Sequence, residues 1–153
     1  MSGVKIDKTT KDRLLEAAKD ILSNAYAPYS NCRVAAAVVD NKENIYTGVN
    51  VENASFGLTV CAERNAIAAM VKAGGKRIEA ILIISNIGAI PPCGACRQVI
   101  AEFAEERVPI FLADDSGILE EWTLGGLLPR IYRPDKWLFT NSKSSGKSIS
   151  SQK

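Results

Sequence analysis

The sequence predicts a three-layer α/β/α domain built around a mixed β-sheet. Helical and strand-like patterns follow one another in the order α-β-β-α-β-α-β-β. The run at residues 80–85 is apolar up to its closing serine, as in a central strand that helices cover on both faces. A length of 153 residues suggests one domain, which can bury a core without disulfides.

The N-terminal part of the chain is expected to form one helix and a β-hairpin. Apolar residues recur at helical spacing over residues 8–25, and the segment around Pro28 ends that pattern. Small and β-branched residues at 33–39 indicate a buried strand, which a polar turn joins to a second strand at 45–49. Residues 52–59 are expected to be a loop.

The remaining elements alternate between helices and strands. Periodicity and turn residues predict helices at 61–73 and 94–104, strands at 80–85, 108–113 and 118–123, and a short helix at 124–128. Residues 141–153 are rich in serine and lysine and lack an apolar anchor, so we expect a disordered tail. The folded domain should therefore span residues 1–140.

Composition excludes several classes of protein. The formal net charge is +2, from 19 basic and 17 acidic residues, and the absence of a basic stripe argues against nucleic-acid binding. No apolar run is long enough for a membrane span, and the N-terminus lacks the apolar stretch of a secretory signal. We therefore expect a cytoplasmic protein whose four cysteines serve a metal site rather than disulfides.

The motifs that carry chemistry are Cys61-Ala62-Glu63 and the later Pro92-Cys93-Gly94-Ala95-Cys96. Each begins a predicted helix, where free N–H groups and the positive end of the helix dipole favour a thiolate. Catalytic zinc has three protein ligands and an open fourth position, so three cysteines and one unligated carboxylate suit it. Cys61, Cys93 and Cys96 are the predicted zinc ligands, and Glu63 is the predicted proton carrier.

The charge of such a site needs compensation. Three thiolates and Zn²⁺ sum to −1, which weakens the metal as a Lewis acid. Arg64 and Arg97 each adjoin a predicted ligand and could donate hydrogen bonds to the sulfurs. The alternative for each arginine is a solvated surface charge, and this alternative is favoured more for Arg97 than for Arg64.

The cysteines allow two other interpretations. Cys93 and Cys96 alone have the spacing of a redox pair, but that interpretation leaves Glu63 without a task. A structural four-cysteine zinc site would require Cys32, which has no paired neighbour in the sequence. A small buried apolar residue is the favoured interpretation of Cys32.

From about residue 28 to 132 the chain resembles the zinc-dependent homotetrameric cytidine deaminases. The resemblance rests on Pro28-Tyr29-Ser30, the run Gly48-Val49-Asn50-Val51-Glu52-Asn53-Ala54-Ser55, the two cysteine motifs through Arg64 and Gln98, and Leu127-Leu128-Pro129. It implies a cytidine deaminase-like fold and a homotetramer with one zinc ion per subunit. The implied reaction is hydrolytic deamination of cytidine and deoxycytidine by zinc-activated water, in pyrimidine salvage.

The resemblance also implies residues that contact the substrate. Asn50 and Glu52 match the family's ribose-binding pair, although polar residues in a loop often only cap it. The backbone N–H of Ala62 and the carbonyls near Pro92 are the implied contacts to the base.

Cys32 stands where the family usually has a phenylalanine that packs on the pyrimidine, and Ala35 stands where it usually has glycine. Loss of the ring removes stacking worth roughly 1–3 kcal/mol per base, which leaves the preferred nucleoside open. Tyr132 occupies the position of a phenylalanine that reaches a neighbouring subunit's site.

Three rival functions share part of this signature. A deaminase of a modified cytosine nucleoside such as blasticidin S has the same zinc motif, but Asn50 and Glu52 favour a ribose-like sugar. A polynucleotide deaminase would need a basic groove, which the near-neutral chain does not offer. A zinc-stabilised binding module without catalysis would have no use for Glu63.

Overall fold

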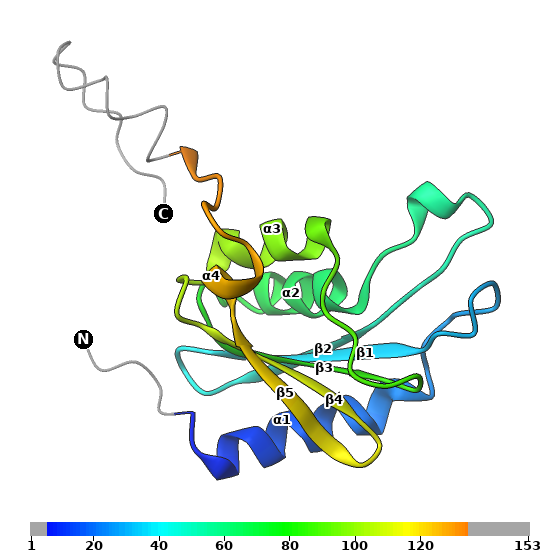
Figure 1. Ribbon diagram of the computed structural model, residues 1–153, viewed down its shortest axis with the longest axis horizontal. Helices are drawn as coiled ribbons and strands as arrows, with labels where there is room; N and C mark the ends of the chain where they lie inside the picture. The colour runs from blue at the N-terminus through cyan, green and yellow to red at the C-terminus, as the bar shows by residue number, and fades with distance from the viewer. Residues whose placement is uncertain (1–5, 135–153) are drawn as a thin grey trace, which may run out of the picture.

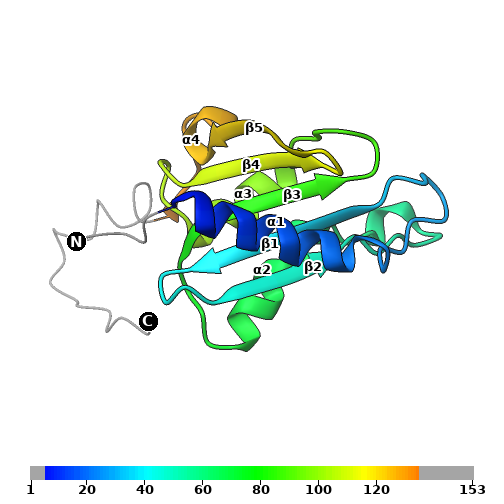
Figure 2. The ribbon, with the colours of Figure 1, turned by 90° about the horizontal axis from the view of Figure 1, so that it is seen from below.

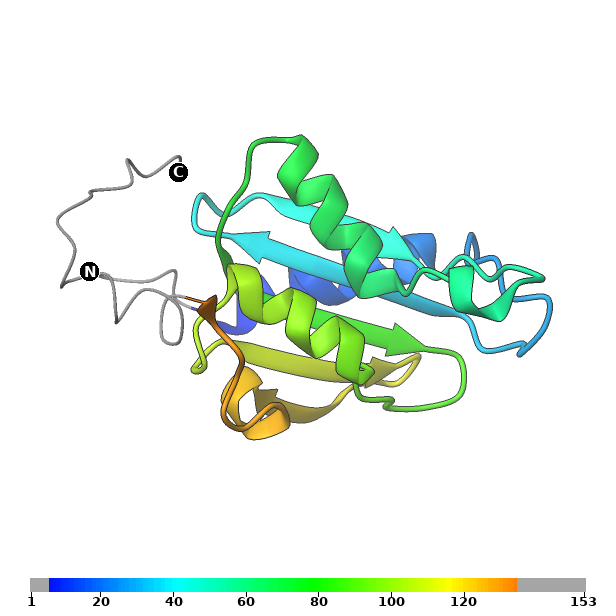
Figure 3. The same cartoon turned by 90° about the horizontal axis from the view of Figure 1, so that it is seen from above.

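The computed structural model describes residues 6–134 and places a five-stranded sheet between two helical layers (Figure 1). Helix α1 (Lys8–Leu22) covers one face of the sheet (Figure 2). Helices α2 (Ala62–Lys72) and α3 (Gly94–Phe103) lie side by side on the other face (Figure 3). The predicted three-layer fold is confirmed, whereas the expected tail at 141–153 lies outside the described residues.

The sheet is mixed, as predicted. Its order is β2-β1-β3-β4-β5, and only β3 and β4 run parallel. In the sequence α3 lies between these two parallel strands and forms the crossover that connects them. The strands are β1 (Val34–Asp40), β2 (Ile45–Val49), β3 (Ile78–Ser85), β4 (Pro109–Asp114) and β5 (Gly117–Thr123).

Two hydrophobic clusters hold the layers together, one on each face of the sheet. Residues of β1 alternate between them: Ala35 and Ala37 pack towards α1, and Ala36 and Val38 pack towards α2 and α3. Every residue of β3 is buried, as its apolar run predicted. Within residues 6–134, none of the helices is both long enough and apolar enough to cross a membrane.

Several boundaries differ from the predicted ones. Helix α1 ends at Leu22 rather than at 25, because Tyr26 leaves the helix and exchanges backbone bonds with Asn50 and Glu52. A short 3₁₀ turn, η1 (Phe56–Leu58), interrupts the predicted loop. The last described helix, α4, covers Leu124–Leu127.

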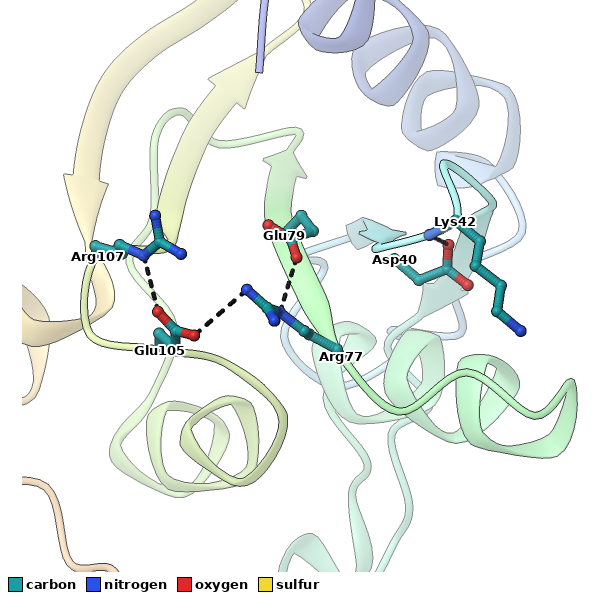
Figure 4. Close-up of polar contacts among 6 residues, drawn as sticks. All are labelled: Asp40, Lys42, Arg77, Glu79, Glu105 and Arg107. Atoms are coloured by element: carbon teal, nitrogen blue, oxygen red, sulfur yellow. Dashed lines mark hydrogen bonds and ion pairs between the residues drawn. The ribbon is translucent and has the colours of Figure 1, made fainter. Parts of the chain in front are cut away.

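Strand β3 begins at Ile78, two residues earlier than the apolar run indicated. Glu79 directly precedes that run, and its carboxylate is paired at 2.8 Å with Arg77 (Figure 4). Arg77 also contacts Glu105, which is paired with Arg107 on the far side. The ion pair allows a nearly buried carboxylate within the strand.

The β1–β2 turn closes around the buried side chain of Asp40. Its carboxylate accepts bonds from the backbone N–H groups of Lys42 and Asn44 and from the Tyr46 hydroxyl (Figure 4 shows the first). Burial by itself would raise the pKa of Asp40, but these hydrogen bonds outweigh it and hold that pKa below its usual value. The ionised carboxylate therefore stabilises the hairpin.

Candidate metal and catalytic centre

Three cysteine side chains meet where α2 and α3 begin. Cys61 and Cys93 are the extended N-cap residues of the two helices, and Cys96 lies in the first turn of α3. Their Sγ atoms all lie within 4.8 Å of one another, and those of Cys61 and Cys93 are 3.9 Å apart. A tetrahedral zinc ion with bonds of about 2.3 Å requires sulfurs about 3.8 Å apart, so the donor set fits this metal.

The local environment favours thiolate at Cys61. A hydrogen bond from Cys96, followed by contacts with Arg64 and Cys93, lowers the pKa of Cys61 to about 5. The same bond and burial raise the pKa of Cys96. Cys93 Sγ accepts from the backbone N–H of Cys96 at 3.5 Å, as an N-cap side chain does.

Arg64 lies beside the sulfur cluster. Its Nη2 is 3.9 Å from Cys61 Sγ and donates to the Thr59 carbonyl at 3.1 Å. Its Nε is buried and has no hydrogen-bond partner among the described residues. The guanidinium thus brings positive charge to the place where three thiolates would gather.

The Arg97 guanidinium donates to backbone carbonyls and not to the sulfurs, so the hypothesis that it bonds to a thiolate is wrong. Its Nε donates to the Pro92 carbonyl at 2.8 Å and its Nη1 to the Leu127 carbonyl at 2.6 Å. The solvated-charge interpretation is also wrong, because the guanidinium is engaged between two backbone segments.

Glu63 occupies the first turn of α2, and only 4% of its surface is exposed. Burial raises the pKa of Glu63, and the negative charge of Cys61 raises it further. A hydrogen bond from the backbone N–H of Glu63 lowers this pKa, but burial outweighs it. A raised pKa makes a carboxyl group a better proton acceptor, and it can then return that proton. Glu63 therefore has the properties of a general acid–base group beside a metal.

A glycine allows α2 to approach the sheet closely enough to carry these groups. A Cβ on Gly48 would lie 2.3 Å from the Ala66 nitrogen and 2.6 Å from the Ala62 oxygen. Asn65 fixes the same approach, since its Nδ2 donates to the Val49 carbonyl at 2.8 Å. Gly48 was missed as a determinant of the site, although glycine within a strand pattern signals close backbone approach.

The two residues expected to bind ribose have structural partners as well. Asn50 is buried and bridges the Cys32 carbonyl and the Val34 N–H through its amide. Glu52 accepts from the N–H groups of Tyr29 and Ser30, both at Oε1. These bonds shape the loop before β1, and against the effect of burial they lower the pKa of Glu52.

The other two expected substrate residues, Cys32 and Tyr132, are not part of the three-cysteine group. Cys32 is half-buried, packs against the cluster of core residues beneath α2 and α3, and lies outside the three-cysteine group. Tyr132 is exposed, and its carbonyl accepts from Gln98 Nε2 at 3.1 Å. All four cysteines are free thiols.

The fold and the sulfur cluster together define a zinc-binding deaminase domain. The family model described as the cytidine and deoxycytidylate deaminase zinc-binding region matches residues 8–112. The chain therefore belongs to the cytidine and deoxycytidylate deaminase family.

Individual relatives agree with this assignment. A cytidine deaminase from Sporosarcina psychrophila is 40% identical over 119 residues, which cover 77% of this chain and 88% of that protein. The crystal structure of a cytidine deaminase from Burkholderia pseudomallei has a TM-score of 0.74 at 42% identity, covering 79% of this chain and 98% of its own. A blasticidin-S deaminase from Bacillus cereus is more distant, at 28% identity over 78% of this chain and 89% of its own.

Proposed function

We propose that this protein is a zinc-dependent cytidine deaminase, which hydrolyses cytidine and deoxycytidine to uridine and deoxyuridine with release of ammonia. The observation that carries the proposal is the group of three Sγ atoms within 4.8 Å beside the buried carboxyl of Glu63. Relatives named cytidine deaminase, about two fifths identical over most of the chain, supply the substrate class.

Cys61, Cys93 and Cys96 would hold the zinc ion, which supplies a Lewis acid that lowers the pKa of a water molecule. Glu63 would take one proton of the attacking water and deliver it to N3 of the base. It would then carry that water's second proton from the C4 hydroxyl to the amino group, which leaves as ammonia as the C4 carbonyl forms. Burial keeps this carboxyl away from bulk water, so its protons pass to the substrate. Ala62 is the first residue of α2, and its N–H has no acceptor within the helix, so it can donate to the base.

The sugar is proposed to bind at Asn50 and Glu52. The backbone N–H groups of Tyr29 and Ser30 both bond to Oε1 of Glu52, so its second oxygen is proposed to accept from a sugar hydroxyl. The amide of Asn50 uses one hydrogen and one lone pair in the loop and retains another of each. Cys32, whose carbonyl Asn50 holds, is proposed to line the wall facing the base.

Distant similarity to a blasticidin-S deaminase makes that antibiotic the second candidate substrate. The test is an ultraviolet assay of the zinc-loaded protein on cytidine, deoxycytidine and blasticidin S, with ammonia release measured in parallel. Turnover of the two nucleosides well above that of blasticidin S supports the proposal. Faster turnover of blasticidin S, or ammonia release from none of the three, would refute it.

The family resemblance also supports proposals for the extent of the domain, the number of subunits and the cellular location. A catalytic domain at residues 1–140, a homotetramer, and a cytoplasmic role in pyrimidine salvage fit the resemblance, and free thiols fit a reducing compartment. Exposed apolar side chains at Tyr29, Phe56 and Leu58 offer surface for subunit contact, and Tyr132 is proposed to reach a neighbouring site. Light scattering of the purified chain tests the subunit number.

A further inference from the structure

Arg97 connects three segments that are separate in the sequence. It lies one residue after Cys96, and its Nε–H donates to the carbonyl of Pro92, the residue immediately before Cys93. Its Nη1 donates to the carbonyl of Leu127, the last residue of α4. One guanidinium therefore ties the loop that leads into Cys93 to the helix that follows β5.

The contact with Pro92 controls a torsion that the sequence leaves free. Pro91 and Pro92 have fixed φ angles, but rotation about ψ of Pro92 still turns the peptide plane leading into Cys93. A bond of 2.8 Å to the Pro92 oxygen sets that plane and hence the direction of the Cα–Cβ bond of Cys93. Cys93 is the most exposed of the three cysteines, so packing fixes it least.

The planar fork of arginine suits this geometry. Two donors of one rigid group serve two carbonyls at 2.8 and 2.6 Å, which a lysine ammonium on a flexible stem does not reproduce. The Leu127 carbonyl lies at the end of α4 and accepts no hydrogen bond within that short helix. The bond from Arg97 therefore also supplies this carbonyl with a donor.

We infer that Arg97 is a positioning residue for the metal centre, acting through the Pro92 carbonyl on Cys93 rather than by contact with any sulfur. This inference rests on the proposed zinc site. Its expected effect is faster loss of zinc, because changes in the groups that orient a ligand commonly cost about 10- to 100-fold in metal affinity or activity.

Arg133 is a matched control, because it bonds to the other end of the same helix. Arg133 donates to the carbonyls of Ala101 and Ala104 at 2.7 Å each, and so ties the segment after α4 to the end of α3. Like Arg97, it uses two guanidinium nitrogens on two backbone oxygens. Unlike Arg97, it bonds to the end of α3 remote from Cys93.

The experiment compares Arg97→Gln, Arg97→Lys and Arg133→Gln with the wild type, all as zinc-loaded full-length chains. Zinc release to a chromogenic chelator and thermal unfolding are measured on each. We expect release about 10- to 100-fold faster in both Arg97 variants. Arg133→Gln should lower the melting temperature to a similar extent while releasing zinc within about twofold of wild type.

The lysine variant retains charge and chain length, which preserves a test if Arg97→Gln does not fold. Unchanged zinc release in the folded Arg97 variants would overturn the inference, as would equally fast release from Arg133→Gln. Zinc release is measured without any catalytic turnover. A failure of this inference can therefore be distinguished from a failure of the proposed function. A wild type that holds zinc but deaminates no nucleoside would refute the proposed function and leave this test intact.

Discussion

Replacing Gly48 by alanine tests how closely α2 must approach the sheet for the site to work. The added Cβ would meet the Ala66 nitrogen at 2.3 Å and the Ala62 oxygen at 2.6 Å. Both are backbone atoms of α2, so no side-chain rotation relieves the contact. Ordinary van der Waals contact begins at about 3.4 Å, which means that the helix must move by roughly 1 Å.

That displacement acts on the residues at the start of α2. Overpacking of a tight core costs about 1–3 kcal/mol, and we expect the upper end because backbone must shift. Since Cys61, Ala62 and Glu63 travel with the helix, a shift of this size should reduce kcat/KM by about 100-fold.

The assay combines urea unfolding with nucleoside turnover at saturating zinc. Gly57→Ala is the control, because a Cβ there has no atom within 4 Å, and it should stay within about 0.5 kcal/mol of wild type. If Gly48→Ala unfolds at the wild-type urea midpoint and keeps wild-type kcat/KM, the account of how β2 positions the site is wrong.

Four further substitutions give distinct expectations. Glu63→Gln should retain its zinc but lose about 10²- to 10⁴-fold in kcat, measured by metal analysis and ultraviolet assay; undiminished turnover would remove Glu63 from its role. Asp40→Asn should lower the free energy of unfolding by about 1–3 kcal/mol at pH 7. Because the folded pKa of Asp40 lies below the unfolded value of about 3.9, its stabilisation is present above pH 4 and is lost as pH falls through the folded pKa. Urea midpoints of wild type and Asp40→Asn should therefore converge in acid, and a constant difference would contradict this. Cys96→Ala should abolish zinc retention while Cys32→Ala preserves it; equal loss from both would indicate a four-cysteine site.

Much of the fold could be predicted because local patterns agree with the tertiary structure. The apolar run of β3 and the helical spacing of α1 identified elements whose bounds differ from prediction by two or three residues. The differences arise from long-range contacts: Ile78 pairs with Asp40 of β1, which extends β3, and the bridge from Tyr26 to Val51 takes the chain out of α1. Neither contact leaves a mark in a local window.

The metal cluster was predictable for a related reason. Cys61 and Cys93 each follow a loop and begin a helix, and spacing places Cys96 in the first turn after Cys93. The partners of Arg97 could not be predicted, because its hydrogen bonds end on backbone oxygens that carry no residue identity. The close approach at Gly48 depends likewise on packing between α2 and β2.

X-ray absorption spectroscopy of the zinc-loaded protein examines the metal environment most directly. Coordination by Cys61, Cys93 and Cys96 predicts three sulfur scatterers at about 2.3 Å and one lighter atom at about 2.0 Å. The lighter scatterer would be the water on which Glu63 acts. Four sulfurs, or a shell without a light atom, would contradict a hydrolytic centre and indicate a closed structural site.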